Sequence, residues 1–144
     1  MKTTILTLAA AAASALSLQA QIPTDLKLTA NVPFTFHQGD QLMPAGRYEL
    51  STTANGTVTV SQRAAKVAAV SVFTRASAQP VREGYLSFRC YGESNTCFLR
   101  EIAAAGASTT IVIGQGKAER EHARTASTPR IAVIEANVSA RTAE

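Results

Sequence analysis

Apolar and polar residues alternate over several short stretches of the chain, and the longest such stretch runs from 26 to 36. A period of two residues is typical of a β-strand with one face in a core and the other in water. Pro33 interrupts the run, and because proline has no N–H group for a sheet ladder, we expect an edge or a bulge there. The two halves can then pair with different neighbours. The apolar members are Leu26, Leu28, Ala30, Val32, Phe34 and Phe36.

Further strands are indicated downstream by stretches rich in β-branched and aromatic residues. After a polar turn region at 37–47, which Pro44 and Gly46 fix, the strand pattern resumes toward Leu50. The dipeptide Asn55-Gly56 then predicts a hairpin, because it suits the backbone of tight turns. We expect a surface loop at 75–84, and the remaining strands at 58–60, 67–74, 85–91, 97–102, 109–113 and 130–138.

The period changes only in the segment "GKAEREHARTAS", whose alanine, glutamate and arginine residues have high helix propensity. Pro129 ends any helix there. The segment has no strong apolar stripe, so we expect a short helix at about 116–126 that covers one end or edge of the sheet, with His122 in solvent. Together these elements predict an all-β fold, either an antiparallel β-sandwich or a flattened barrel of about eight strands.

The first twenty residues have the pattern of a signal peptide. Lys2 provides the positive start, and the uncharged run of 14 residues from Ile5 to Leu18 is too short to span a bilayer. We expect cleavage after Ala20; the alternative is a buried N-terminal helix. The prediction is a signal peptide at 1–20 and a single β-rich domain at 21–144. This domain is expected to have no transmembrane segment and to be exported, either periplasmic or extracellular.

Cys90 and Cys97 are the two cysteines of the chain. In an exported protein, a pair this close in sequence indicates a disulfide. The intervening "YGESNT" contains turn-forming residues, so the bond would staple a hairpin whose tip is at 92–95. Free thiols are the alternative. A redox pair usually has the spacing C-x-x-C, and a zinc site needs two further ligands.

Charge and composition give little sign of chemistry. The chain carries a formal net charge of +4, but its basic residues are scattered, which argues against a nucleic-acid partner. His37 and Asp40 share the "HQGD" turn, yet no serine lies in a G-x-S-x-G motif and a third metal ligand is missing nearby. Such residues are most often plain turn residues. We therefore expect no catalytic, cofactor or metal site, and we rank a hydrolase using His37 and Asp40 third among the possible functions.

The function that this pattern favours is a non-enzymatic structural or interaction domain of the cell envelope. The sequence does not identify its binding partner; the candidates are a cell-envelope protein and a polysaccharide. The second hypothesis is a small-ligand carrier, in which aromatic side chains line a cavity in the mouth of the barrel or sandwich. Aromatic residues on strands more often fill a core, so a packed interior would argue against a carrier. The side chains concerned are Phe34, Phe36, Phe73, Phe88 and Phe98.

Four blocks occur in the order "VPFTF", "MPAGRY", "SFRCYG" with "CFL", and "KAEREHAR". This ordered set resembles a family of small exported proteins that is common in acidobacteria. The resemblance covers most of residues 31–124 and implies export, but the family is uncharacterised, so it implies no activity, cofactor or catalytic residue. The chain departs from the family at Cys97, where an aromatic residue is expected, and at "REIAAAG", which replaces a segment that often carries tryptophan.

Overall fold

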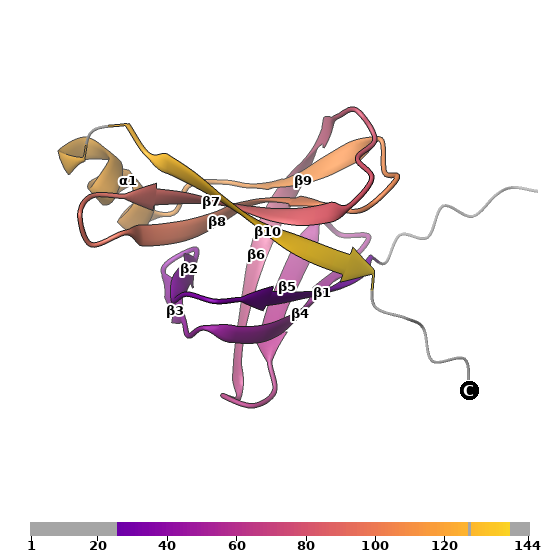
Figure 1. Cartoon of the computed structure of the whole chain (residues 1–144), viewed down its shortest axis with the longest axis horizontal. Helices are drawn as coiled ribbons and strands as arrows, with labels where there is room; N and C mark the ends of the chain where they lie inside the picture. Colours follow the sequence, from indigo (N-terminus) through magenta and orange to yellow (C-terminus); the bar gives the residue numbers. More distant parts are fainter. Residues whose placement is uncertain (1–25, 127, 139–144) are drawn as a thin grey trace, which may run out of the picture.

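The computed structural model describes residues 26–126 and 128–138, and the predicted signal peptide at 1–20, with its cleavage after Ala20, lies outside them. Over the described residues the chain forms ten strands and one helix (Figure 1). In chain order they are β1 (Lys27–Val32), β2 (Phe36–Gln38), β3 (Gln41–Met43), β4 (Gly46–Thr52), β5 (Thr57–Gln62), β6 (Val67–Ser77), β7 (Gly84–Tyr91), β8 (Thr96–Ala103), β9 (Thr109–Ile113), α1 (Lys117–Thr125) and β10 (Arg130–Val138).

Eight of these strands close into a barrel. The hydrogen-bonded order is β8-β7-β10-β1-β4-β5-β6-β9, and β9 pairs back to β8. Every pair in this ring is antiparallel. Two additional strands extend the sheet: β2 pairs with β8, and β3 pairs with β2. The predicted antiparallel all-β fold with one short helix is confirmed, and the closed barrel is the form observed.

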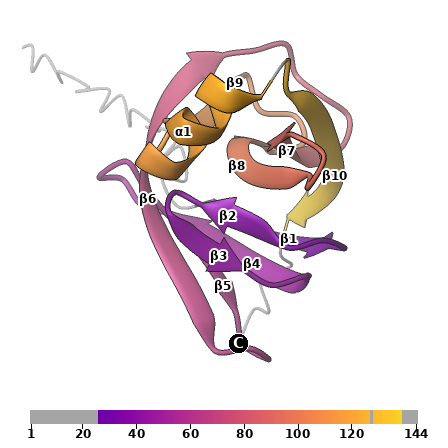
Figure 2. The same ribbon diagram turned by 90° about the vertical axis from the view of Figure 1, so that its left-hand side faces the viewer.

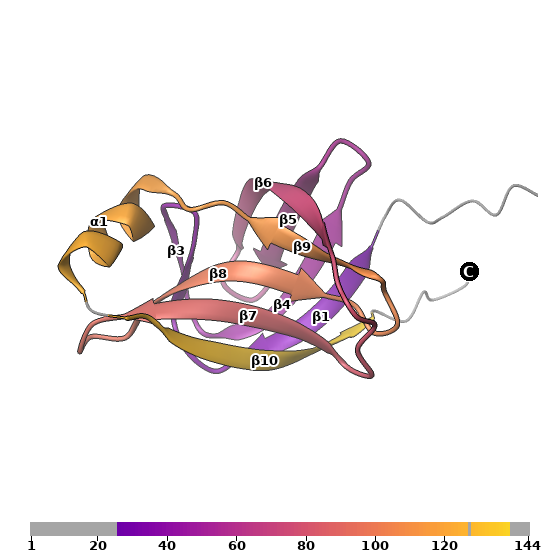
Figure 3. The same ribbon diagram turned by 90° about the horizontal axis from the view of Figure 1, so that it is seen from above.

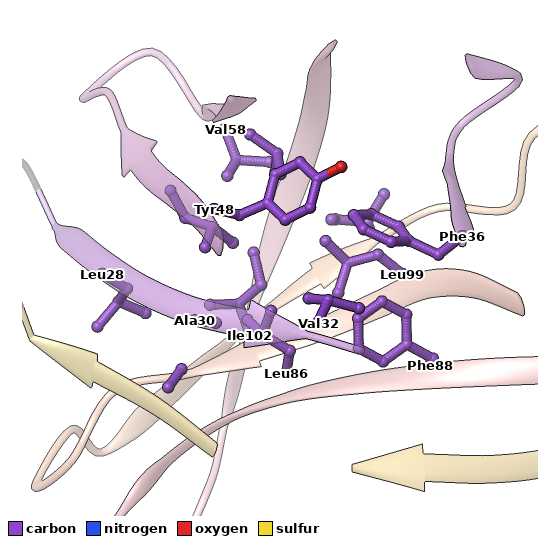
Figure 4. Close-up of a cluster of buried hydrophobic side chains, with 14 of the residues drawn as sticks. Leu28, Ala30, Val32, Phe36, Tyr48, Val58, Leu86, Phe88, Leu99 and Ile102 are labelled. Carbon is purple, nitrogen blue, oxygen red and sulfur yellow. The ribbon is translucent and has the colours of Figure 1, made fainter. Parts of the chain in front are cut away.

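Apolar side chains from alternate strand positions fill the inside of the barrel. Phe36 contacts Tyr48 and Phe88 edge to face, with ring centroids 5.1 and 5.2 Å apart (Figure 4). Burying a side chain of this size contributes roughly 2 to 3 kcal/mol, so the cluster is a main source of stability. Four of the aromatic side chains named above as a possible cavity lining are buried among other side chains instead: Phe36, Phe73, Phe88 and Phe98. The fifth, Phe34, is half-buried against Phe88 and also lines an open groove.

The long alternating run divides at Pro33, as predicted. β1 pairs with β4 and β10, whereas β2 pairs with β3 and β8. The region at 37–47 is more ordered than the single turn expected, because β2 and β3 form a small hairpin within it. Gly39 at the tip of this hairpin has a φ of +60°, a left-handed conformation that glycine adopts at little cost.

Two different segments close the wall between β6 and β8. β9 pairs with both of them. Further along β8, β2 takes this place: His37 lies opposite Phe98 in a parallel bridge. The Nε2 of Gln38 then donates to the Oγ of Ser71 in β6 at 2.9 Å. Figure 2 views the molecule from the end at which β2 and α1 lie.

The hairpin predicted at Asn55-Gly56 is confirmed between β4 and β5. Gly56 has a φ of +81°, which the turn requires. β6 is longer than predicted, because its last residues, from Arg75 to Ser77, pair with β9. The surface loop expected at 75–84 is therefore limited to 78–83.

A disulfide joins Cys90 to Cys97, with an S–S distance of 2.03 Å, and the predicted stapled hairpin is confirmed. The two cysteines lie directly opposite each other in β7 and β8. Gly92 and Asn95 at the tip have positive φ values of 69° and 49°. Glycine and asparagine tolerate this conformation best, so the turn chemistry and the bond agree.

Candidate functional site

Arg100 occupies a β-bulge in β8. The register between β7 and β8 shifts between Ser87 and Phe88, and Arg100 is the residue of β8 that is left without a partner. A bulge of this kind re-aims a side chain. The Nε of Arg100 donates to the carbonyl oxygen of Ile113, at the end of β9, at 2.8 Å. The bulge thus directs the guanidinium toward the segment that leads into α1.

The carboxylate that meets this guanidinium belongs to Glu119, the buried residue of α1, which is only 1% exposed. Its Oε1 accepts hydrogen bonds from Nη1 of Arg100 and from the hydroxyl of Tyr91, both at 2.9 Å. Burial raises the pKa of Tyr91, as do the hydrogen bond and charge of Glu119, so the phenol stays protonated and can donate. A buried carboxylate is costly unless it is paired and hydrogen-bonded. Here both conditions are met.

The N-terminus of α1 is capped from a distant part of the chain. Gly116, at the N-cap, has no side chain that could accept a hydrogen bond from the first turn. Asp40, in the turn between β2 and β3, supplies this acceptor: its Oδ1 takes the N–H of Ala118 at 3.0 Å. Negative charge is favourable at this end of a helix. A Cβ at position 116 would lie 3.0 Å from the same oxygen, so glycine leaves room for the cap.

Aromatic rings form a second contact between α1 and the barrel. Phe98 stacks on His37 with ring centroids 4.9 Å apart and 24° between the planes, and it meets His122 edge to face at 5.6 Å. The Nδ1 of His122 lies 2.9 Å from the carbonyl oxygen of Ala118, in the same helix. His122 was expected in solvent, but it is half-buried, because α1 lies against Phe98.

His37 lies in a partly buried position beside an open groove of about 380 Å³. Burial, and then the nearby His122, lower the pKa of His37; a backbone contact with Cys97 and the charge of Asp40 oppose this more weakly. The imidazole is therefore held toward its neutral form. Its Nδ1 is buried and has no hydrogen-bond partner. Other residues that line the groove are Phe34, Thr35, Leu42, Ser94, Asn95 and Thr96.

The structure places His37 and Asp40 on one hairpin but in separate roles. Among the described residues, no hydrogen bond joins the two side chains, and Asp40 binds the N-terminus of α1 instead. Over the same part of the chain, no three His, Cys, Asp or Glu side chains gather as a metal site would require. At this end of the barrel, Asp40, Tyr91 and Arg100 form hydrogen bonds with α1.

Sequence reasoning missed the buried polar residues that seat α1: Tyr91, Arg100 and Glu119. A polar contact leaves no periodic signal of the kind that apolar faces do. The sequence held one sign that Glu119 is important: it lies in "KAEREHAR", one of the four blocks that resemble the acidobacterial family.

The fold and this site define a closed eight-stranded antiparallel β-barrel with one helix seated against β7 and β8 by a buried polar network. Comparison of the chain with protein-family models, with curated proteins and with solved structures finds no match. Membership of the acidobacterial family stays a prediction. No helix of the described residues is both long and apolar enough to cross a membrane.

Proposed function

We propose that the chain is an exported, non-enzymatic interaction domain that binds a protein of the cell envelope through the outer wall of its barrel. The observation that carries this proposal is the contrast between a filled interior and several large apolar side chains that are exposed on the outside. The interior holds packed side chains where a carrier would need space for its ligand. Six large apolar side chains instead lie 55% to 74% exposed on the outside: Leu42, Val70, Val72, Ile131, Val133 and Val138.

Apolar side chains exposed in groups are a mark of protein interfaces. Val70 and Val72 lie two residues apart on the outer face of β6, and Ile131 and Val133 do so on β10. A polysaccharide would be expected to meet mainly polar groups, so these pairs favour a protein partner. Export is supported by the disulfide, which persists best in an oxidising compartment. The leader pattern and the resemblance to exported proteins point the same way.

The export part of the proposal can be tested by expressing the whole chain in a Gram-negative host and separating its cell fractions. The protein should appear in the periplasm or the medium, with an N-terminus at Gln21 and a mass two hydrogens lower without reductant than with it. A chain that lacks residues 2–20 serves as the control and should stay in the cytoplasm. Retention of the whole chain in the cytoplasm with its leader intact would contradict export.

The interaction part is tested against the carrier hypothesis with a fluorescent apolar dye such as N-phenylnaphthylamine. The folded protein should not enhance the fluorescence of this dye, because apolar side chains of the described strands fill the inside of the barrel. Saturable binding at one site per chain, lost when apolar fatty acids compete, would favour the carrier over an interaction domain.

A further inference from the structure

Both histidines of the chain lie against one aromatic ring at the end of the barrel. His37, in β2, stacks on Phe98 with ring centroids 4.9 Å apart, and His122, in α1, meets the same ring edge to face at 5.6 Å. Figure 3 shows α1 at this end of the molecule, where the β2–β3 hairpin and the ends of β7 and β8 lie. Histidine is the side chain whose charge changes near neutral pH, so the contact between helix and barrel contains two such groups.

The attachment of α1 to the barrel differs from that of most surface helices. Such a helix usually buries an apolar stripe, but the buried residue of α1 is Glu119, which carries a carboxylate. The other contacts described above are the cap that Asp40 provides and the ring of His122 on Phe98. A helix held in this way depends on the charge and protonation of its contacts more than on buried apolar area.

The surroundings of His37 favour its neutral form while α1 is docked. A protonated imidazole carries an N–H on both nitrogens, but the buried Nδ1 of His37 has no hydrogen-bond partner among the described residues. His122 on α1 opposes a positive charge at His37, and Asp40 in the β2–β3 turn favours one more weakly. β8 contributes the ring of Phe98 and the backbone of Cys97, and the other described residues that line the neighbouring groove are uncharged.

We propose that mild acid releases α1 from the barrel through protonation of His37. When the helix leaves, His122 leaves with it and water reaches His37, so a positive charge there is no longer opposed. The released state therefore binds a proton more readily than the docked state, and by linkage acid favours release. Release uncovers Phe98 and Tyr91, which are buried while α1 is docked. The inference goes beyond the interaction domain proposed above, because it assigns a pH-dependent movement to α1.

The pKa of His37 gives the direction of the effect and the pH range in which it acts. Burial, and then the nearby His122, lower this pKa from the ordinary value of 6.5. A base whose pKa is lowered in the docked state supports docking fully above the pKa of the released state. This support is lost as the pH falls from there through the lowered pKa of the docked state. Docking of α1 should therefore weaken as the pH falls below 6.5.

The test is hydrogen exchange of the chain, expressed with its own leader and purified, at about pH 7.5 and about pH 5.5. Protection of 117–125 is measured relative to β4 and β5 in the same sample, because pH changes the chemistry of exchange equally for all amides. The relative protection of α1 should fall at the lower pH, by about fivefold if release raises the pKa of His37 by one unit. Circular dichroism should show that the barrel stays folded at both pH values.

Substitutions identify the group that responds to pH. His37→Gln removes the titrating ring and should leave the relative protection of α1 equal at both pH values. His122→Gln removes the opposing charge, so its response should be smaller than that of the unsubstituted chain. Glu121→Gln is the matched control, because it removes an exposed carboxylate from the same helix, and it should keep the full response. If His37→Gln already loosens α1 at the higher pH, His37→Phe, which keeps a ring against Phe98, takes its place.

Three outcomes would overturn the proposal. One is an unsubstituted chain in which the relative protection of α1 is the same at both pH values. Another is an undiminished response in His37→Gln, which would assign the effect to a carboxylate such as Glu119. The third is a loss of protection in β4 and β5 as large as that in α1, because acid would then unfold the whole barrel. None of these results affects the cell-fractionation or dye-binding tests, so failure of the pH response leaves the proposed function standing.

Discussion

Inside the barrel the buried contacts are between apolar side chains, whereas under α1 the central contact joins a carboxylate, a guanidinium and a phenol. The apolar cluster around Phe88 has no directional requirement, and its contribution grows with the area removed from water. The contact of Glu119 with Arg100 and Tyr91 depends on two hydrogen bonds of 2.9 Å that share one carboxylate oxygen. Its stabilising effect disappears, and becomes a cost, as soon as one partner is removed.

The difference teaches which part of the molecule each kind of contact controls. Apolar packing supplies the stability of the barrel, and it tolerates small changes of shape. The polar network adds less stability, but it favours the one position of α1 in which the carboxylate of Glu119 meets both donors. We infer that the barrel can stay folded when α1 is released, and the predictions below test this separation.

The largest effect is expected from Phe88→Ala in the barrel interior. Phe88 is fully buried, so the change removes its contacts with Phe34 and Phe36 and leaves a cavity. The free energy of unfolding should fall by about 3 to 5 kcal/mol, measured by denaturant titration with circular dichroism. Val70→Ala, on the exposed face of β6, is the control and should change it by less than about 0.5 kcal/mol. If Phe88→Ala does not fold, Phe88→Leu should give a smaller loss in the same direction.

A smaller and more local effect is expected from Glu119→Ala. It leaves the guanidinium of Arg100 and the hydroxyl of Tyr91 without their buried acceptor, a cost of roughly 3 kcal/mol to the docking of α1. Hydrogen exchange followed by mass spectrometry should show faster exchange in 117–125, while β4 and β5 keep their protection. Glu121→Ala is the matched control, because it makes the same change at an exposed position of the same helix.

If Glu119→Ala speeds exchange throughout the barrel as much as in α1, the two regions unfold together and the separation is wrong. If Glu121→Ala has the same effect as Glu119→Ala, the loss comes from helix propensity and not from the buried contact.

The barrel could be predicted from the sequence because its signals are local. Leu28, Ala30 and Val32 face the core at the predicted period of two, and the turns at Gly56 and Gly92 follow from their residue types. The closure of the sheet could not be predicted in the same way. It depends on pairing between strands that are distant in sequence, such as β10 with β1 and β7, and the period of two is the same in a sandwich.

The contacts that hold α1 against the barrel could not be predicted from the sequence for a related reason. The partners of Glu119 are 19 and 28 residues away, and the bulge that aims Arg100 has no local pattern in "LREIA". Asp40 was correctly placed in a polar turn, but the N–H group that donates to it belongs to Ala118, 78 residues further along the chain. The contact between the β2–β3 turn and the first turn of α1 can form only once the folded barrel has brought these two segments together.

The smallest effect is expected from Asp40→Ala, which removes the cap from the N-terminus of α1. Loss of a capping side chain costs about 1 kcal/mol, so exchange in the first turn of α1 should rise less than in Glu119→Ala. Asp40→Asn keeps an oxygen acceptor and should lose less. Glu93→Ala, in the exposed turn between β7 and β8, should leave α1 unchanged.

The double variant Asp40→Ala with Glu119→Ala decides whether both residues act on the same step. If both stabilise the docked helix, then Asp40→Ala has little left to remove once Glu119→Ala has released α1, and the two effects on exchange will not add. Full additivity would mean that Asp40 stabilises the β2–β3 hairpin and not the seat of α1. In that case the polar network would be confined to Glu119, Arg100 and Tyr91, and the cap would be a contact of the hairpin alone.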